Sequence, residues 1–184
     1  MKRVVDERRA AKANSQFFVE KQTQFFLVIR VKGIRKVSPK EKKILRLFRL
    51  RQIGNAVFIR NNKATMNMLR RIEPWVTYGA PSRRVVRNLV YKRGFGTLNK
   101  QRIPLTSNAI VAEGLSKHGI KCMEDLVHEI WTLGENFKAV TNFLWPFKLN
   151  APRGGFKAKR HAYLNNGTVG PRGEFINNLA DRML

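Results

Sequence analysis

The stretch Phe25-Phe26-Leu27-Val28-Ile29-Arg30-Val31-Lys32 decides the fold class of this chain. It is rich in aromatic and β-branched residues, apolar on both faces at first and alternating at its end, which predicts a strand closed by Gly33. Ser38-Pro39-Lys40-Glu41 then begins a helix. Ser38 can cap it, proline suits its first position, and Glu41 completes a capping box. We expect this helix to run to about Ile53, with Gly54 as its stop.

The same alternation of strand and helix continues to residue 79. A strand is expected at residues 56–60, a helix at 62–72 and a short strand at 75–78, ended by Gly79 and Pro81. The order β-α-β-α-β over so few residues predicts a small α+β layer. Beyond it, helices are expected at 83–91, 107–115, 122–133, 136–144 and 174–183.

The charge balance restricts the possible partners. The 184 residues include 37 Lys and Arg against 12 Asp and Glu, a formal charge of +25. Such a chain repels itself when compact, and nucleic acid is the abundant intracellular partner that compensates this charge. The 12 Phe, 3 Trp and 3 Tyr argue against a wholly disordered basic tail. The cations run through segments that read as folded, whereas residues 114–149 carry four basic and four acidic groups and are expected to pack on protein.

Within the helix expected at 39–53, Lys42, Arg46 and Arg49 share the face opposite Ile44, Leu47 and Phe48. Such a basic stripe is often only a solvated face. Because Glu41 is the one acidic residue interleaved with it, phosphate contact is the favoured interpretation.

Two stretches are expected to be basic loops that combine glycine with an aromatic residue. Residues 92–102 contain Arg93-Gly94-Phe95-Gly96, and residues 152–160 contain Gly154-Gly155-Phe156-Lys157. Glycines allow the backbone to approach phosphate, and Phe95 and Phe156 are candidates for stacking on bases. The alternative for the first segment is a plain surface loop with Phe95 turned into the core. Residues 92–102 lack the third glycine of a dinucleotide-binding fingerprint and a Walker-type lysine, so a nucleotide-binding loop is not expected there.

The sequence offers no catalytic or metal constellation. The three histidines are scattered and Cys122 is the single cysteine, which excludes an intrachain disulfide and favours a reducing compartment. The longest early apolar run, at 25–29, is too short to span a membrane. We therefore expect no enzyme activity, cofactor, metal, membrane contact or small-molecule substrate.

Longer motifs resemble a known family. They are Asn88–Gly96, Asn99–Thr106, Cys122–Ile130 and Asn142–Leu149, followed by Pro152-Arg153-Gly154-Gly155. From about Phe17 to the end, the chain resembles large-subunit ribosomal protein thirty in universal naming, which is protein seven in eukaryotic naming. The resemblance implies an antiparallel three-stranded sheet in the β-α-β-α-β core and a eukaryotic-type C-terminal extension. Eukaryotic members usually carry a longer basic N-terminal arm than the one beginning here at Met1, so the contacts of that arm are not carried over.

The resemblance implies a structural constituent of the large ribosomal subunit that binds rRNA and neighbouring ribosomal proteins, without homo-oligomerising. It implies a cytosolic location, with passage through the nucleolus during assembly. We expect a basic N-terminal helical arm at 1–23, the core at 24–80 and a helical and loop extension at 81–184. Two alternatives are an RNA-processing enzyme, which would need a catalytic cluster, and a free-standing architectural RNA or DNA binder, which leaves residues 114–149 unexplained. The candidate RNA-binding residues are Arg35, Lys36, Lys42, Arg46, Arg49, Arg83, Arg84, Arg87, Lys92, Arg93, Phe95, Lys100, Arg102, Arg153, Phe156, Lys157, Lys159 and Arg160.

Overall fold

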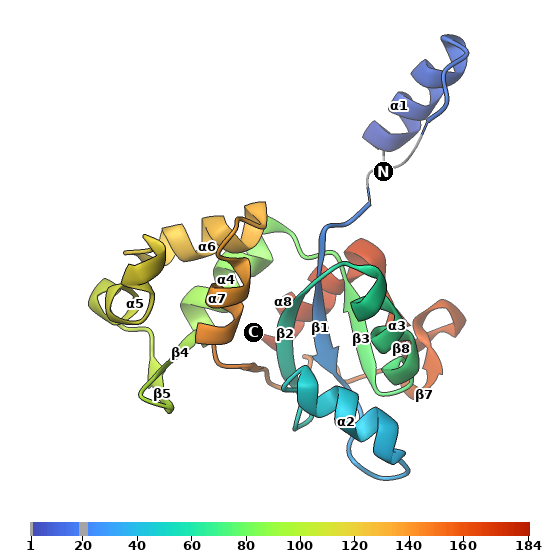
Figure 1. The fold of residues 1–184 in the computed structure, drawn as a ribbon. Coiled ribbons are helices and arrows are strands. Elements are labelled where there is room, and N and C mark those ends of the chain that lie inside the picture. Colours follow the sequence, from blue (N-terminus) through green and yellow to red (C-terminus); the bar gives the residue numbers. More distant parts are fainter. Residues whose placement is uncertain (1, 19–21) are drawn as a thin grey trace.

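The structure is a computed structural model that describes residues 2–18 and 22–184. Its centre is a mixed sheet with strand order β6-β2-β1-β3-β8-β7, and β4 and β5 form a separate hairpin (Figure 1). The strands are β1 (Phe25–Arg30), β2 (Asn55–Arg60), β3 (Val76–Gly79), β4 (Phe95–Leu98), β5 (Gln101–Pro104), β6 (Phe147–Lys148), β7 (Ala158–Ala162) and β8 (Gly167–Pro171). The helices are α1 (Lys2–Ala13), α2 (Pro39–Leu47), α3 (Lys63–Ile72), α4 (Arg83–Arg93), α5 (Asn108–Leu115), α6 (Met123–Thr132), α7 (Phe137–Phe143) and α8 (Ile176–Met183). Short 3₁₀ turns lie at Ser116–His118, Tyr163–Asn165 and Gly173–Phe175.

The first strand is apolar on both faces because the sheet is covered on both. Leu27 and Ile29 face a cluster shared with α4 to α8, whereas Val28 faces a cluster shared with α2 and α3. β1 pairs antiparallel with both β2 and β3, which confirms the three-stranded antiparallel unit expected for the core.

The sheet is larger than expected, because later segments add strands to both of its edges. β6 pairs antiparallel with β2, and β8 runs parallel to β3 and carries β7 on its outer side. Thr77 in β3 lies opposite Gly170, and its hydroxyl donates a hydrogen bond to the Gly170 carbonyl oxygen at 3.0 Å. The C-terminal residues therefore share the core's own sheet.

The helix that begins at Ser38 has the predicted capping box, but it ends at Leu47 rather than near Ile53. Arg49 takes a left-handed φ of 59°, and the Leu50 N–H bonds back to the Leu45 carbonyl oxygen at 2.8 Å. This closure is a Schellman motif, in which a residue other than glycine fills the left-handed position. The expectation that Arg49 lies on a helix face is therefore wrong.

Three smaller expectations also change. The 107–115 helix is preceded by Ser107 as its N-cap residue, so its first helical residue is Asn108. The final helix begins at Ile176, after a 3₁₀ turn. Residues 92–102 are the end of α4 followed by a β-hairpin rather than a loop. Among the described residues, no helix is long and apolar enough to cross a membrane.

Candidate nucleic-acid interface

A basic pocket lies between α2, the segment after β1, and residues 50–51. It encloses about 450 Å³, and its lining includes the cations Arg30, Lys42, Arg46 and Arg51 together with apolar surface from Ile34, Val37 and Leu45. No carboxylate of the described residues lines it. The predicted α2 cations Lys42 and Arg46 are both exposed here, with Ile34 70% exposed at the same site.

Arg30 supplies a buried positive charge at this pocket. Its side chain is only 3% exposed and donates to the carbonyl oxygens of Lys32, Gly33, Leu50 and Arg51. No acidic partner for it occurs in the described part of the chain. Burial lowers the pKa of the guanidinium, because it disfavours the charged form. A buried charge that meets only carbonyl dipoles favours an anion nearby.

Arg49, the third cation of the predicted stripe, binds protein groups and does not line the basic pocket. The Arg49 guanidinium donates to the carbonyl oxygens of Thr141, Asn142 and Leu144 at the end of α7. Burial lowers the pKa of Arg49 as well. Its donors are therefore occupied by protein, and Arg51 takes its place beside Lys42 and Arg46.

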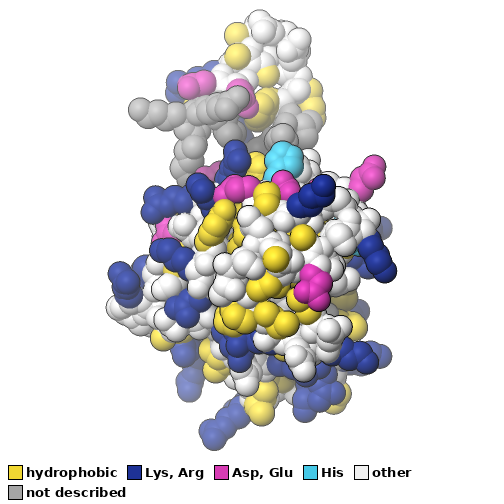
Figure 2. Space-filling view, turned by 90° about the vertical axis from the view of Figure 1, so that its left-hand side faces the viewer, with side chains coloured by type: hydrophobic (Ala, Val, Ile, Leu, Met, Phe, Trp, Pro, Cys, Tyr) yellow, Lys and Arg dark blue, Asp and Glu magenta, His cyan; other side chains and the backbone are white. Residues whose placement is uncertain are grey.

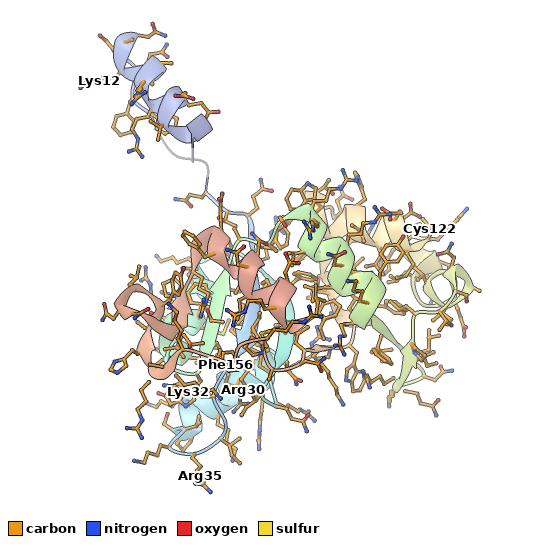
Figure 3. The ribbon with its side chains drawn as sticks, turned by 180° about the vertical axis from the view of Figure 1, so that it is seen from behind. Lys12, Arg30, Lys32, Arg35, Cys122 and Phe156 are labelled. Carbon is orange, nitrogen blue, oxygen red and sulfur yellow. The ribbon has the colours of Figure 1, made fainter. Side chains whose placement is uncertain are left out.

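The residues after β1 add further cations to the same end of the molecule. Arg35 and Lys36 are exposed, and Figure 3 shows Arg35 beyond Arg30 and Lys32, far from Cys122. Burial, and after it the charge of Arg160, lowers the pKa of Lys32. Lys32 follows β1 directly and Arg160 lies in β7, so the fold brings together cations from distant parts of the sequence.

The first glycine-containing segment folds as a hairpin with a two-residue turn. Asn99 and Lys100 both have positive φ, 50° and 62°, as a type I′ turn requires. Lys100 stands at the exposed tip, and the Arg102 guanidinium lies 3.4 Å from the centre of the Phe95 ring. Phe95 is half-buried, so its availability for base stacking is lower than the sequence implied.

The second segment, residues 152–160, is a loop only up to residue 157, because β7 begins at Ala158, but it keeps its exposed cations. Arg153, Lys157, Lys159 and Arg160 are all exposed. Phe156 packs partly against the core, and the Lys159 ammonium lies 4.8 Å from its ring centre. Arg182 donates to the carbonyl oxygens of Arg153 and Gly155 and so fixes the segment on α8. Lys157 donates to Asn166 at 2.9 Å.

The α4 cations form a separate group. Arg83, Arg84 and Lys92 are exposed, and Arg93 is half-buried at the helix end. Arg87 pairs with Glu124 of α6 at 3.1 Å and lies over Tyr91, so it is engaged within the protein. In Figure 1, α2, β7 and the hairpin tip lie along the lower side of the molecule, away from the N-terminal helix.

The helical side of the molecule differs from this basic side. Figure 2 looks at the side on which α5 and α6 lie, and hydrophobic side chains gather near its middle with Lys and Arg mainly around them. Residues 114–149 supply buried side chains such as Leu126, Ile130 and Val140 to the larger core cluster. The prediction that this neutral stretch packs on protein is confirmed for the contacts within the chain.

Sequence reasoning did not single out Arg51, Asn55, Trp145 or Lys148 as site residues. They line a second cavity that shares Arg51 with the basic pocket. Trp145 and Lys148 lie in the Asn142–Leu149 motif, but no spacing linked them to Arg51 and Asn55, because the pairing of β2 with β6 brings the two segments together. Within residues 2–18 and 22–184, no group of three or more His, Cys, Asp or Glu side chains is placed to hold a metal ion.

Comparison with known proteins gives a consistent result. Residues 26–76, which hold β1 to β3, match the family model described as Ribosomal protein L30p/L7e. The chain is 50% identical over 183 residues to "Large ribosomal subunit protein uL30" of Tetrahymena thermophila, covering 100% of this chain and 77% of that protein. The Drosophila melanogaster protein of the same name is 51% identical over 183 residues, with 99% and 73% covered. The Neurospora crassa protein is 51% identical over 176 residues, with 95% and 71% covered.

Proposed function

This chain belongs to the Ribosomal protein L30p/L7e family, and we propose that it holds rRNA in the large ribosomal subunit through the basic pocket beside α2. It is a structural constituent of the large subunit, not an enzyme, and its place is the cytoplasmic ribosome. The observation that carries the RNA contact is the group of exposed cations Lys42, Arg46 and Arg51 around the buried Arg30, in a pocket that no carboxylate of the described residues lines.

Phosphate is the chemistry that fits this pocket. Each cation close to a phosphate releases condensed counterions, so affinity falls linearly with the logarithm of salt concentration. Contacts of this kind fix position and shape rather than base sequence. Arg35, Lys36, Lys100, Arg153 and Lys157 extend the proposed phosphate contacts, because all are exposed.

The other side is proposed to meet protein. The neutral residues 114–149 and the hydrophobic surface in Figure 2 fit a neighbouring ribosomal protein better than a phosphate backbone. We further propose that the arm at 1–23, the core at 24–80 and the extension at 81–184 are the working divisions of the chain. The proposal also includes that the chain does not form homo-oligomers and that it passes through the nucleolus during assembly.

The test is the salt dependence of binding to large-subunit rRNA. Replacing Lys42, Arg46 and Arg51 with Gln is expected to weaken binding and to reduce the slope of log K against log salt by up to about three phosphate contacts. The matched control replaces Lys117, Lys121 and Lys138, three exposed lysines of the neutral stretch, and so changes the net charge equally. Equal effects of the two triple variants would show that net charge alone acts, and would contradict the pocket.

Sedimentation provides the second test. The wild-type protein is expected to travel with the large subunit through a high-salt gradient, and the pocket variant to leave it at lower salt. Dissociation of the wild-type protein at modest salt would contradict a structural role. Matched-salt affinities for structured RNA and duplex DNA separate this function from that of a free-standing DNA binder.

A further inference from the structure

A second cavity, of about 460 Å³, lies where the start of β2, the end of α7 and β6 meet. Its lining includes Arg51, Gln52, Asn55, Asn142, Trp145 and Lys148, and none of the carboxylates in residues 2–18 and 22–184. The volume lies within the range of small-ligand sites, which is about 300–1,000 Å³. Arg51 also lines the basic pocket, so the two hollows are neighbours on one surface.

Asn55 is the unusual residue of this cavity. It is 8% exposed, and its backbone is used by the pairing of β2 with β6, where it lies opposite Lys148. Its side-chain amide has no hydrogen-bond partner among the described residues. No fully enclosed side-chain nitrogen or oxygen of those residues lacks a partner, so the Asn55 amide keeps some access to solvent at a position that lines the cavity. Because no protein group uses this amide, a ligand in the cavity could take its hydrogen bonds in place of water.

Trp145 gives the cavity an aromatic component. It is half-buried, and its backbone N–H donates to the Phe95 carbonyl oxygen at 2.8 Å, which ties it to the hairpin. An indole ring stacks on any base, and each stacked base contributes about 1–3 kcal/mol. Gln52 and Asn142, both exposed, supply further amides near it. Amide groups match the donor and acceptor pattern of a base edge.

The cations complete the set. Arg51 and Lys148 are exposed at the cavity, where they suit the phosphates on either side of an inserted nucleotide. An aromatic ring, several amides and two exposed cations without a carboxylate match the way proteins bind unstacked RNA bases. We propose that this cavity binds one unstacked nucleobase of RNA, stacked on Trp145 and hydrogen-bonded by Asn55. The proposal rests on the rRNA-binding function and names the group that it recognises.

The experiment compares a single-stranded oligoribonucleotide with the same backbone lacking its bases, using the full chain at several salt concentrations. The wild-type protein is expected to bind the base-containing oligonucleotide about 5- to 150-fold more tightly, the range that one stacked base gives. Trp145→Leu and Asn55→Ala should reduce this ratio and leave the salt slope unchanged. Lys42→Gln is the matched control, which should lower the salt slope and leave the ratio unchanged.

A second measurement does not depend on variants that fold. Ultraviolet irradiation of the wild-type complex should place a nucleotide adduct on the peptide that contains Trp145. Equal affinity for both oligonucleotides, or adducts only elsewhere, would overturn the nucleobase site while leaving RNA binding intact. Failure to bind either oligonucleotide or large-subunit rRNA would instead refute the proposed function. If an acidic peptide quenched the part of the tryptophan fluorescence that Trp145→Leu removes and RNA did not, the cavity would belong to a protein segment and the proposal would be wrong.

Discussion

The guanidinium group of Arg49 donates a 2.9 Å hydrogen bond to the backbone carbonyl oxygen of Leu144, just beyond the end of α7. It also bonds the carbonyl oxygens of Thr141 and Asn142, which are among the groups that a helix leaves unpaired at its C-terminus. A positive charge at this position further complements the helix dipole. The chain around Arg49 thereby attaches the core to the helical extension.

Replacing Arg49 with Ala should lower the free energy of unfolding by about 1–3 kcal/mol, the range for hydrogen bonds to a charged group. Arg49→Gly should lose about 1 kcal/mol less, because glycine adopts the positive φ without strain. Urea unfolding followed by circular dichroism measures both. Arg46→Ala, in the exposed face of α2, is the control and should change stability by about 0.5 kcal/mol or less. Equal losses in Arg46→Ala and Arg49→Ala would contradict the attachment.

Arg30 should matter more for stability than any exposed cation of the pocket. Arg30→Met leaves the carbonyl oxygens of Lys32, Gly33, Leu50 and Arg51 without their donor, and should destabilise by about 2–4 kcal/mol. Arg30→Lys keeps the charge but lacks the planar fork, so it should recover only part of this loss. Arg51→Met, at an exposed position, is the matched control. Urea unfolding midpoints compare the three variants, and a lysine variant as stable as wild type would show that charge rather than geometry is required.

The elements that sequence reasoning placed correctly are those with a local cause. The run of aromatic and β-branched residues in Phe25–Arg30 and the capping box at Ser38 each lie within a few neighbouring residues, and both predictions are confirmed. The end of α2 was misplaced, because a left-handed arginine is stabilised by tertiary contacts to α7 rather than by local preference. β6 spans only Phe147–Lys148 and exists because β2 offers an edge to pair with.

The residues of the candidate site could likewise be predicted only where they lie close together in the sequence. Lys42 and Arg46 could be named from helical spacing, because both lie within two turns of one helix. Asn55 and Trp145 could not, because 90 residues of chain separate them and only the β2–β6 pairing brings them to one cavity. Phe95 was named for its glycine neighbours, yet Gly96 serves packing. A Cβ there would lie 2.5 Å from the Phe143 ring.

Gly114 offers a second test of packing against Phe143, because replacing this helical glycine with alanine should destabilise the fold rather than stabilise it. Gly→Ala inside a helix normally stabilises by about 0.8–1.0 kcal/mol. In α5, however, the new Cβ would lie 2.3 Å from the Phe143 ring, so Gly114→Ala should destabilise by about 1–3 kcal/mol. Combining it with Phe143→Leu should cost less than the sum of the two single changes, as residues in contact do. Thermal unfolding of the two single variants and the double variant measures this coupling, and strict additivity would contradict the contact.

The start of α6 should make stability depend on pH through Asp125. The pKa of Asp125 lies below the usual 3.8 because of the Cys122 side chain beside it and the backbone N–H groups of Lys121 and Cys122, which donate to its carboxylate. The Asp125 N–H in turn donates to the Cys122 sulfur at 3.4 Å. Because the folded pKa lies below the unfolded one, the stabilisation is fully present above about pH 4 and is lost as the pH falls through the folded pKa.

Asp125→Asn should therefore reduce the free energy of unfolding near neutral pH by about 0.5–1 kcal/mol, as the loss of other helix caps does. The difference in stability from wild type should shrink as the solution is acidified. Cys122→Ala removes the side chain that lowers the pKa of Asp125 and should weaken the same dependence, whereas Cys122→Ser keeps a hydrogen-bonding group there and should retain it. Urea unfolding at a series of pH values between about 2 and 7 spans the titration. A difference between wild type and Asp125→Asn that stays constant over this range would show that the carboxylate stabilises α6 by some means other than its charge.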